Sequence, residues 1–465
     1  MHEQIASAKD YFYLTSLVWQ DDAEGRALGR HVAAAKLNLT PERLQGRIKQ
    51  GQSIREIRNH RLSAAIWRRN RIAGTTISRR QAVQKVASMS ERERALAVGR
   101  EIKKLDVRIY LSMMPQLRQL GFWRLLSPAL ANIERVGGEV LMAHSPLTFR
   151  IPLALRNLWS TTSHAKLLLT PGEVSISGFN VGDEYYQKKG PLKWHDVGIH
   201  LQGDVANTQL RNFARHWARE ADRSPTRASP LLFTGLKRTR VGAQRGIKED
   251  ARSLENPRLA GVIVGSDDLS SSEKPKFNER AELAYALATF KESFVTTSPY
   301  LTSTFFAERA LATVKRRKAQ GKDAGVELIL PAQGFDEWTS DGGAAHDLTA
   351  QLKAAGAKIH HWAPAQRRRR FKRYDDNAFI HAKVSQYDKK VTKVSSANKN
   401  RRSLERDWET GFVTRSRHIA QEVLHRVIEP TIAQSTPMLL FPNTWWHRAM
   451  SRVKRFVFGK LGKLY

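Results

Sequence analysis

Short segments rich in β-branched and aromatic residues alternate along the chain with longer stretches of helical character, and the order of these segments is repeated. In the first half, a helix end leads into a strand within Ile5–Ser16, and the same pattern recurs within Leu287–Ser298. Strand candidates at Val107–Leu111 and Val326–Leu330 follow, each ahead of a helical stretch. Strands separated by helices predict α/β construction in each half.

The two halves continue to match after these helices. Both helical stretches end at a glycine, Gly137 or Gly356, as is common just after a helix C-terminus. A further strand follows at Glu139–Met142 in one half and at Lys358–His361 in the other. The shared order and spacing predict a duplicated architecture of two similar lobes.

Each half then shows the pattern of a β-hairpin. Thr170–Glu173 and Asp388–Lys390 carry the turn residues, and the returning strands are Val174–Ser177 and Val391–Val394. We therefore expect a pair of antiparallel strands at the same place in both lobes.

The tripeptide His-Ala-Lys opens each hairpin. Its copies are His164–Lys166 and His381–Lys383, and an asparagine follows each of them, Asn180 and Asn398. In an extended strand residues i and i+2 point to the same face, so each His and Lys would reach one space, and the Asn would return to it from the next strand. Two such half-sites facing each other predict one phosphate-handling site.

These residues suit the cleavage of a phosphodiester without a metal ion. One imidazole would attack phosphorus and form a covalent phospho-histidine, and the other would protonate the leaving alcohol. Lys166, Lys383 and the two asparagines would stabilise the charge on the phosphoryl oxygens. Water as acceptor gives hydrolysis and an alcohol gives transfer. The pattern itself is symmetric as to which histidine attacks.

Two acidic residues are candidates for orienting the imidazoles. A catalytic imidazole needs a partner on its second nitrogen to fix its tautomer, and Asp196 and Glu409 each lie downstream of their own half-site. An acid at a strand end can also make a simple surface contact, but the duplicated arrangement favours the orienting role.

Composition narrows the possible partners. Lys and Arg number 78 against 44 Asp and Glu, so the 465-residue chain has a net charge of +34, which indicates nucleic acid or an anionic membrane surface as partner. The absence of cysteine excludes disulfides and thiolate catalysis. His195-Asp196 and His360-His361 lack the spacing of a zinc helix motif, and no Walker loop or dinucleotide fingerprint occurs, so we expect no metal and no cofactor.

Segments outside the repeat complete the predicted domain plan. We expect a first lobe at 1–222, a linker at 223–258, a second lobe at 259–432 and a basic aromatic tail at 433–465. A basic, arginine-dense insertion at about 37–104 interrupts the first lobe and reads as helical. It fits either a solvated surface or a basic face for membrane or nucleic acid.

The tail favours lipid over nucleic acid as partner. It places aromatic residues such as Trp445 and Phe456 beside cations such as Arg455, as interfacial amphipathic helices do. A further basic cluster, Arg367–Arg373, would lie at the mouth of the site. Because the chain shows neither a secretory signal nor an apolar run long enough to span a bilayer, we expect a peripheral protein.

The second half-site belongs to a longer pattern. The residues that carry it are His381, Lys383, Asp388, Ser395, Ser396 and Asn398. They resemble the H-x-K-x4-D-x6-G-S-x-N signature of the phospholipase D superfamily. Other stretches look most like bacterial cardiolipin synthases, namely Asn398–Glu409, Gly178–Tyr185, Trp194–Asp196 and Arg156-Asn157.

The chain departs from this signature in two places. Thr170-Pro171 stands where the family has Asp and the first motif is one residue short, while the second motif has Ser395 for the usual Gly. The resemblance implies that this Asp is structural, so its loss concerns the hairpin more than catalysis. By the same resemblance His164 is the nucleophile and His381 the acid.

The resemblance implies two tandem phospholipase D-like α-β-α lobes related by a pseudo-two-fold axis, with the active site at their interface. It further implies a phosphatidyltransferase that acts on phospholipid at the cytoplasmic face of the bacterial inner membrane and makes cardiolipin or a related anionic phospholipid. A phospholipase D, including an exported effector, and a phosphatidylserine-synthase-like transferase are the alternatives, and a nuclease or other phosphodiesterase is less favoured. A non-catalytic membrane-binding module would not need every polar site residue. Donor, acceptor and oligomeric state are not encoded in these motifs.

Overall fold

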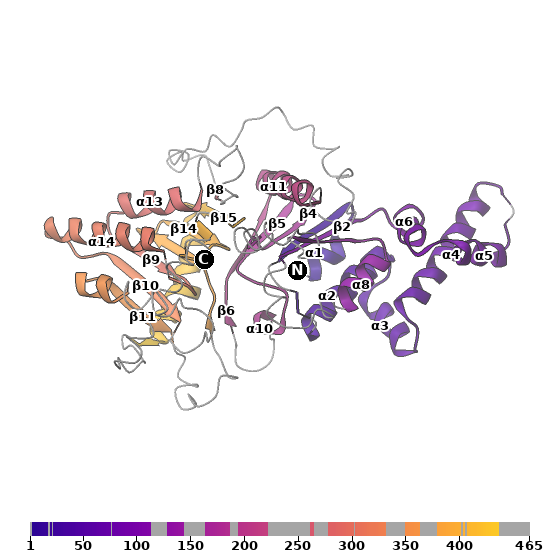
Figure 1. Ribbon diagram of the computed structural model, residues 1–465, viewed down its shortest axis with the longest axis horizontal. Coiled ribbons are helices and arrows are strands. Elements are labelled where there is room, and N and C mark those ends of the chain that lie inside the picture. The colour runs from indigo at the N-terminus through magenta and orange to yellow at the C-terminus, as the bar shows by residue number, and fades with distance from the viewer. Residues whose placement is uncertain are drawn as a thin grey trace, which may run out of the picture.

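The chain folds into two α/β lobes, with a helical arm extending from the first (Figure 1). The computed structural model describes residues 2–16, 19–20, 22–75, 77–112, 128–143, 163–186, 194–221, 261–264, 278–301, 303–331, 349–362, 379–400, 403–404 and 407–436. None of the helices in these ranges combines the length and the apolar character needed to cross a bilayer.

The sheet of the first lobe has six strands in the order β3-β2-β1-β4-β5-β7. Three of them, β1, β2 and β3, pair in parallel, and β4, β5 and β7 are added in antiparallel fashion. The strands are β1 (Tyr11–Ser16), β2 (Asp106–Ser112), β3 (Glu139–Ala143), β4 (Leu167–Thr170), β5 (Glu173–Ser177) and β7 (Gly198–Gln202). The predicted strands of the first half are thus confirmed, and they lie side by side in one sheet.

The second lobe repeats this order. Its eight-stranded sheet runs β16-β11-β10-β9-β13-β14-β15-β8, and the six central strands correspond to those of the first sheet. They are β9 (Phe294–Thr297), β10 (Val326–Pro331), β11 (Lys358–Trp362), β13 (Val384–Tyr387), β14 (Val391–Ser395) and β15 (Gly411–Thr414), with β8 (Gly261–Val264) and β16 (Ser435–Thr436) at the edges. The predicted duplication and α/β fold class are therefore confirmed.

Helices cover both faces of each sheet. In the first lobe α11 (Asp204–Ala221) covers one face, and α1 (His2–Ser7), α2 (Ala23–Lys36) and α8 (Pro128–Arg135) cover the other. In the second lobe α13 (Glu279–Thr289) and α14 (Thr304–Ala319) lie opposite α17 (Arg417–Val423), the π-helix η5 (Leu424–Ile428) and α18 (Glu429–Ala433). Burial on both faces explains why strands such as β1 and β13 contain buried residues throughout.

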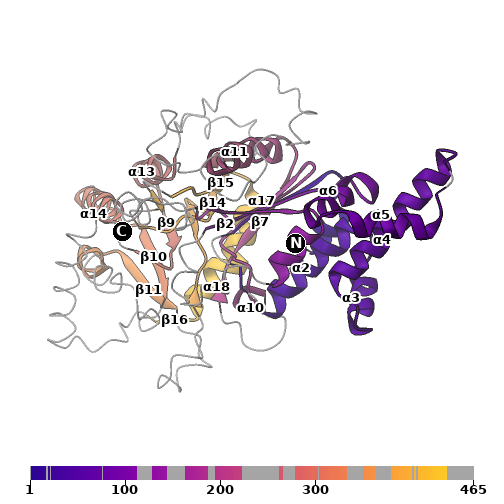
Figure 2. The same cartoon turned by 45° about the vertical axis from the view of Figure 1, so that its right-hand side comes forward.

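The insertion at 37–104 is helical, as predicted, and forms the arm. Its helices are α3 (Pro41–Lys49), α4 (Ile54–Ile72), α5 (Arg79–Ser88) and α6 (Glu91–Glu101). Thr40 caps α3, and a Ser90–Glu93 capping box begins α6. Two views show α4 and α5 extending away from both sheets (Figures 1 and 2).

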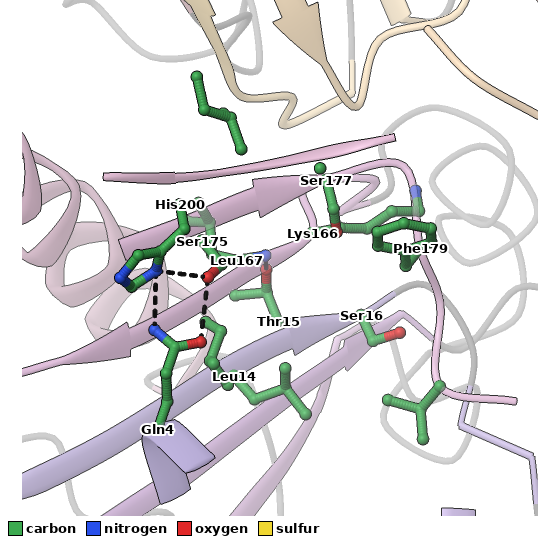
Figure 3. A pocket seen from close by; sticks show the side chains of 14 residues that line it. Gln4, Leu14, Thr15, Ser16, Lys166, Leu167, Ser175, Ser177, Phe179 and His200 are labelled. Atoms are coloured by element: carbon green, nitrogen blue, oxygen red, sulfur yellow. Dashed lines mark hydrogen bonds between the residues drawn. The ribbon is translucent and has the colours of Figure 1, made fainter. Parts of the chain in front are cut away.

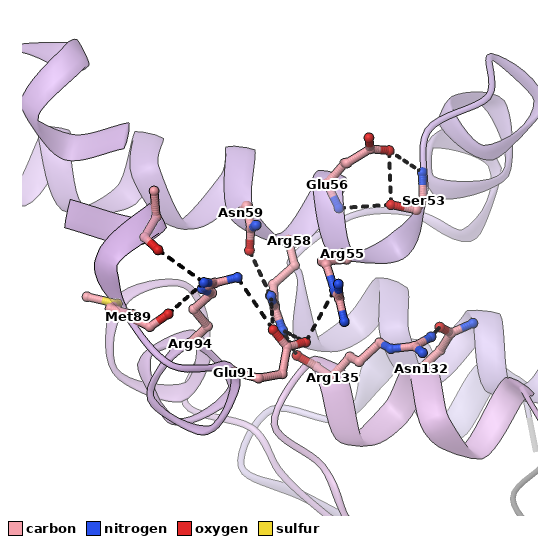
Figure 4. A network of polar contacts seen from close by, with 11 residues as sticks. Ser53, Arg55, Glu56, Arg58, Asn59, Met89, Glu91, Arg94, Asn132 and Arg135 are labelled. Atoms are coloured by element: carbon pink, nitrogen blue, oxygen red, sulfur yellow. Dashed lines mark hydrogen bonds and ion pairs between the residues drawn. The ribbon is translucent and has the colours of Figure 1, made fainter. Parts of the chain in front are cut away.

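A network of polar contacts fixes the base of the arm to the first lobe (Figure 4). The guanidinium of Arg58, which is fully buried, donates to both carboxylate oxygens of Glu91 at 2.8 and 3.0 Å and to the carbonyl of Arg135 at 2.8 Å. Arg58 belongs to α4, Glu91 to α6 and Arg135 to α8. A bidentate pair of this kind holds the three helices in a fixed geometry.

Several segments that the sequence singled out lie outside the described residues. These are the expected linker at 223–258, the tail beyond residue 436, the Arg367–Arg373 cluster and Arg156-Asn157. The domain boundaries drawn from the sequence stay predictions.

Candidate active site

Each of the two histidines contacts an acidic residue of the other lobe. Nδ1 of His164 lies 2.8 Å from Oε1 and 3.0 Å from Oε2 of Glu409. Nδ1 of His381 lies 2.5 Å from Oδ2 of Asp196. His164, His381 and Glu409 are buried residues. Asp196 is partly exposed through its backbone, but its side chain is fully buried. The acids that the sequence placed downstream of their own half-sites therefore pair crosswise.

Backbone pairing between the lobes produces this crossing. Ser163 forms a parallel bridge with Trp408, and the His164 N–H donates to the Trp408 carbonyl at 2.9 Å. On the other side, strands β6 (Trp194–His195) and β12 (Phe379–Ile380) pair in parallel, and the His381 N–H donates to the His195 carbonyl at 2.8 Å. In both cases the acceptor immediately precedes the acid, so the two contacts repeat each other in pseudo-symmetric fashion.

The His-Ala-Lys tripeptides lie just before β4 and β13 rather than within them, which corrects the expectation of a continuous strand. The reason is that each histidine N–H pairs with the opposite lobe. The alternation of faces is nevertheless present, because Ala165 and Ala382 are buried in hydrophobic clusters of their lobes.

The two lysines stand beside their own histidines. Nζ of Lys166 donates to the His164 carbonyl at 2.8 Å. Nζ of Lys383 donates to the His381 carbonyl at 2.6 Å and lies 3.0 Å from both ring nitrogens of His381. The local geometry of each half-site is thus built within three residues of sequence.

The two asparagines are both buried but differ in their contacts. Nδ2 of Asn180 donates to the hydroxyl oxygen of Tyr185 at 2.7 Å. Oδ1 of Asn398 is buried and has no hydrogen-bond partner within the described part of the chain. An amide whose polar atom is buried without a partner is typical of a site that a ligand completes.

Burial shifts the pKa values of the basic groups downward. Desolvation lowers the pKa of Lys166 to about 8 and that of Lys383 to about 7. It lowers the pKa of His164 and, more strongly, that of His381, to which the charges of Lys383, Lys166 and His164 contribute. Both histidines and both lysines therefore interact electrostatically across the interface, as a single site requires.

The two acids respond differently to burial. Desolvation raises the pKa of Asp196 to about 7. It acts in the same direction on Glu409, but the charge of His164 and hydrogen bonds from His164 and Ser396 outweigh it, so the pKa of Glu409 is lowered. The two half-sites are therefore alike in geometry and unlike in electrostatics.

Two small residues that the sequence did not assign to the site lie beside the two acids. The Ser396 hydroxyl donates to Oε2 of Glu409 at 2.5 Å. The position equivalent to Ser396 in the first half is Gly178, where a Cβ would come within 2.1 Å of Oδ1 of Asp196. Glu409 thus accepts a hydrogen bond from the Ser396 hydroxyl. Asp196 instead occupies the space beside Gly178 that a larger side chain would fill.

A buried ion cluster supports the second half-site from behind. Nζ of Lys393 on β14 donates to Glu279 and, at 2.5 Å, to Glu282, both on α13. The Ser395 hydroxyl donates to Oε1 of Glu279 at 2.6 Å and accepts from the N–H of Ala397 at 3.0 Å. Ser395, which replaces the usual glycine of the second motif, thus connects the ion cluster to the loop that leads to Asn398.

A cavity of about 220 Å³ lies beside the first half-site (Figure 3). Leu14, Leu168 and Ile199 contribute apolar walls, and Lys166 also borders the cavity. At its rim, Gln4 contacts Ser175 at 3.0 Å and His200 at 3.2 Å. Separately, within the described ranges, no three His, Asp or Glu side chains are grouped as a metal site would need.

Comparison with known proteins agrees with this geometry. A family model described as "Cardiolipin synthase, PLD-like domain" matches residues 286–428. A cardiolipin synthase of Staphylococcus aureus is 24% identical over 299 residues, which are 63% of this chain and 51% of that protein. Cardiolipin synthase 2 of Staphylococcus epidermidis is 25% identical over 57% of this chain and 47% of its own length. The second half of this chain thus matches a phospholipase D-like domain, and the chain resembles cardiolipin synthases.

The fold of the chain also matches a solved structure. The phosphatidylserine synthase of Haemophilus influenzae Rd KW20 superposes with a TM-score of 0.57 and 13% identity, over 100% of this chain and 92% of that one. This likeness concerns the fold. The chain spans about half the length of the cardiolipin synthases that it matches.

The departures from the phospholipase D signature have a structural explanation. Asp388 has a positive φ of 54° in a three-residue turn between Tyr387 and Val391, and its carboxylate accepts from the N–H groups of residues 291, 292 and 293. In the first half, Pro171 and Gly172 close a two-residue turn, with Gly172 at φ 78°. Proline followed by such a glycine forms a tight turn without a carboxylate, which explains both the missing Asp and the missing residue.

Proposed function

We propose that this protein is a phosphatidyltransferase that makes cardiolipin or a related anionic phospholipid at a membrane surface, through a phospho-histidine intermediate. The observation that carries the proposal is the crosswise pairing of two buried histidines with Glu409 and Asp196, with a buried lysine beside each histidine. The similarity to proteins named cardiolipin synthase supports a phospholipid as the substrate.

His164 is the proposed nucleophile. Its Nδ1–H donates to Glu409, whose pKa is lowered, so Nε2 keeps its lone pair and an ionised carboxylate balances the positive charge of a phosphorylated imidazole. In the first step Nε2 of His164 bonds to phosphorus, the bond from phosphorus to the leaving alcohol oxygen breaks, and His381 gives that oxygen a proton. The anionic phosphodiester favours the protonated form of His381, against the burial and the positive charges that lower its pKa in the free site.

The second step reverses the first with a new alcohol. His381, now neutral, takes the proton of the acceptor hydroxyl while its oxygen attacks phosphorus, and the bond to His164 breaks. With phosphatidylglycerol as both donor and acceptor, the products are cardiolipin and glycerol. With water as acceptor, the same steps give phosphatidic acid, which is the phospholipase D alternative.

The lysines and asparagines stabilise the negative phosphoryl oxygens. Lys166 and Lys383 have pKa values lowered to about 8 and about 7 by burial, and an anionic phosphate between them favours their charged forms. In this proposal the side-chain N–H groups of Asn398 donate to such an oxygen, since the amide oxygen can only accept. No step requires a metal ion, so we propose metal-independent catalysis.

Direct assay of the purified protein tests this proposal. Phosphatidylglycerol, CDP-diacylglycerol with serine, phosphatidylcholine and DNA are offered separately, with and without a chelator. We expect transfer that releases glycerol from phosphatidylglycerol and survives the chelator. His164→Ala and His381→Ala should each reduce the rate by roughly 10³-fold or more, as removal of a nucleophile or its base does.

His425→Ala is the matched control. His425 also pairs with a carboxylate, Glu429, at 2.8 Å, but this pair lies on the surface of the second lobe, and its loss should leave the rate unchanged. Turnover of DNA without turnover of any phospholipid would assign the site to a phosphodiesterase, and abolition by the chelator would refute the metal-independent step.

A further inference from the structure

We propose that the end of the helical arm binds an anionic phospholipid bilayer, with Ile72 entering the headgroup boundary between arginine side chains. The arm tip is defined as residues 67–75 and 77–85, which comprise the last turns of α4, the described part of the connection and most of α5. This inference goes beyond the proposed reaction, because binding to a bilayer requires no turnover.

The arm tip exposes apolar side chains that the fold leaves uncovered. Within the described ranges, three large hydrophobic side chains are exposed, namely Ile72 (88%), Leu96 (59%) and Val83 (56%), and two of them belong to the tip. Ile72 is the last residue of α4, a helix that extends away from both sheets (Figure 1). Apolar side chains at such a protruding end gain free energy by leaving water for the acyl boundary of a membrane.

The charge of the arm tip is complementary to anionic lipid. Between Glu56 and Glu91 the sequence contains no acidic residue and eight basic ones, Arg58, Arg61, Arg68, Arg69, Arg71, Arg79, Arg80 and Lys85. Arg68, Arg71, Arg79, Arg80 and Lys85 are exposed, and no ion pair involves them in the part of the chain that the structure describes. Cations at this density near a surface bind anionic headgroups.

Basic residues nearer the lobe have a different role. Arg58 is buried and is fully engaged by Glu91 and the Arg135 carbonyl (Figure 4), and these contacts fix the arm to the lobe. Within the arm tip, Arg69 pairs with Glu101 of α6 at 2.5 Å, while Arg68 and Arg71 have no ion pair among the described residues. Because α4 has 19 residues, it reaches about 28 Å, far enough to present the tip away from both sheets.

Trp67 organises the arginines of the tip. It packs against the small hydrophobic cluster between α4 and α5, and the guanidinium groups of Arg71 and Arg79 lie 5.6 and 4.6 Å from its ring centroid. Cation–π contacts of this kind keep the two charges at the surface on either side of the connection. The tip is therefore a preformed basic surface with an apolar residue at its end.

A bilayer fits this surface better than nucleic acid does. Phosphates of a duplex would satisfy the arginines, but nucleic-acid binding provides no burial for Ile72 and Val83. A bilayer accommodates both features, since its headgroups meet the cations and its acyl boundary receives the apolar side chains.

Vesicle sedimentation of the full chain tests the proposal. Vesicles of phosphatidylcholine, with and without phosphatidylglycerol, are compared for the wild type and for Arg79→Gln/Arg80→Gln. At about fivefold per cation, the double change should weaken binding to the anionic vesicles roughly thirtyfold. The matched control is Arg92→Gln/Arg100→Gln, which removes the same charge from exposed positions of α6 and should change binding little.

A fluorescent label locates the contact. Because the chain contains no cysteine, Ile72→Cys provides a single attachment point for an environment-sensitive dye, and Leu96→Cys provides the control outside the tip. Anionic vesicles should shift the emission of the dye at position 72 to the blue and leave that at position 96 unchanged. Circular dichroism confirms that each variant is folded.

Three outcomes would overturn the proposal. They are equal loss of vesicle binding in the two double variants, a dye at position 72 that stays in water while the protein sediments, and a tip variant that loses DNA binding but retains vesicle binding. Adding His164→Ala separates this proposal from the proposed reaction, because that variant should bind vesicles like the wild type while it turns over no lipid.

Discussion

At the scale of single residues, the site is a cluster of charges held away from water. Lys166, Lys383 and both histidines are buried, and their lowered pKa values express the free-energy cost of keeping them charged there. Glu409 and Asp196 offset part of this cost through their contacts with the opposite histidines. The site is thus poised to gain stability when a phosphate anion enters.

The pH dependence of the rate should reveal these shifts. As pH rises, Lys383 loses its positive charge through a pKa of about 7 and Lys166 through one of about 8, so kcat/KM should fall from neutrality upward. A bound anionic phosphodiester raises the pKa values of both lysines. The fall of kcat on the alkaline side should therefore occur at higher pH than that of kcat/KM. A kcat/KM that stays flat up to about pH 10, where ordinary lysines titrate, would contradict this assignment.

The crosswise contacts should appear as coupling energies in the free energy of unfolding. We expect double-mutant cycles for His164→Ala with Glu409→Gln, and for His381→Ala with Asp196→Asn, to give interaction terms of about 1–3 kcal/mol in urea denaturation. The pair His164→Ala with Asp196→Asn is the control and should give a clearly smaller interaction term, because these two side chains make no direct contact. A larger interaction term for a histidine and an acid of the same lobe than for a pair from opposite lobes would contradict the crosswise arrangement.

The residue types of the site were predictable from sequence, but their partners were not. The repeated His-Ala-Lys words and the following asparagines identified which side chains gather. Chain order suggested that each acid serves its own half, whereas long-range backbone pairing at Trp408 and His195 delivers it to the other. Lys393 and its two glutamates carried no motif, since they meet only through the packing of α13 on β14.

At the scale of elements, the two hairpins show how different turns fulfil one role. Both turns return a strand that leads to a site asparagine. The second hairpin is tied to the start of β9 by Asp388, while the first uses Pro171 and Gly172. The strands of each hairpin and the turn between them were predictable from their residue types. That the Asp388 carboxylate accepts hydrogen bonds from the backbone ahead of β9 was visible only in the structure.

Replacing Asp388 should therefore affect stability and not catalysis. Asp388→Ala removes a charged acceptor of three backbone N–H groups and should lower the free energy of unfolding by about 1.5–3 kcal/mol, with kcat unchanged for the folded enzyme. Lys390→Ala, at an exposed position of the same turn, should cost less than about 0.5 kcal/mol. A fall in kcat without a change in stability would instead give Asp388 a role in the site.

At the scale of the whole molecule, neither lobe contains both a site histidine and the acid that contacts it. Each lobe supplies a histidine and the acid for the histidine of the other lobe. The repeated order of elements made two similar lobes predictable, and the sign of the net charge indicated a polyanionic partner. The arm's direction could not be read from the sequence, because it depends on the tertiary contacts of Arg58.

Separation of the lobes should abolish turnover. Residues 1–258 and 259–465, produced apart, should show no phospholipid transfer, because His164 then lacks Glu409 and His381 lacks Asp196. Co-production should restore a measurable rate if the interface reforms, and co-purification of the two pieces reports whether it has. Activity in residues 259–465 alone would show that the crosswise contacts are dispensable.

The exchange of acids between lobes also bears on ancestry. A solitary ancestral lobe of this design would have held a histidine without its acid, and two identical copies facing each other would have corrected that lack on both sides at once. Two copies joined in one polypeptide are free to diverge, and in this chain one side holds serine and glutamate where the other holds glycine and aspartate.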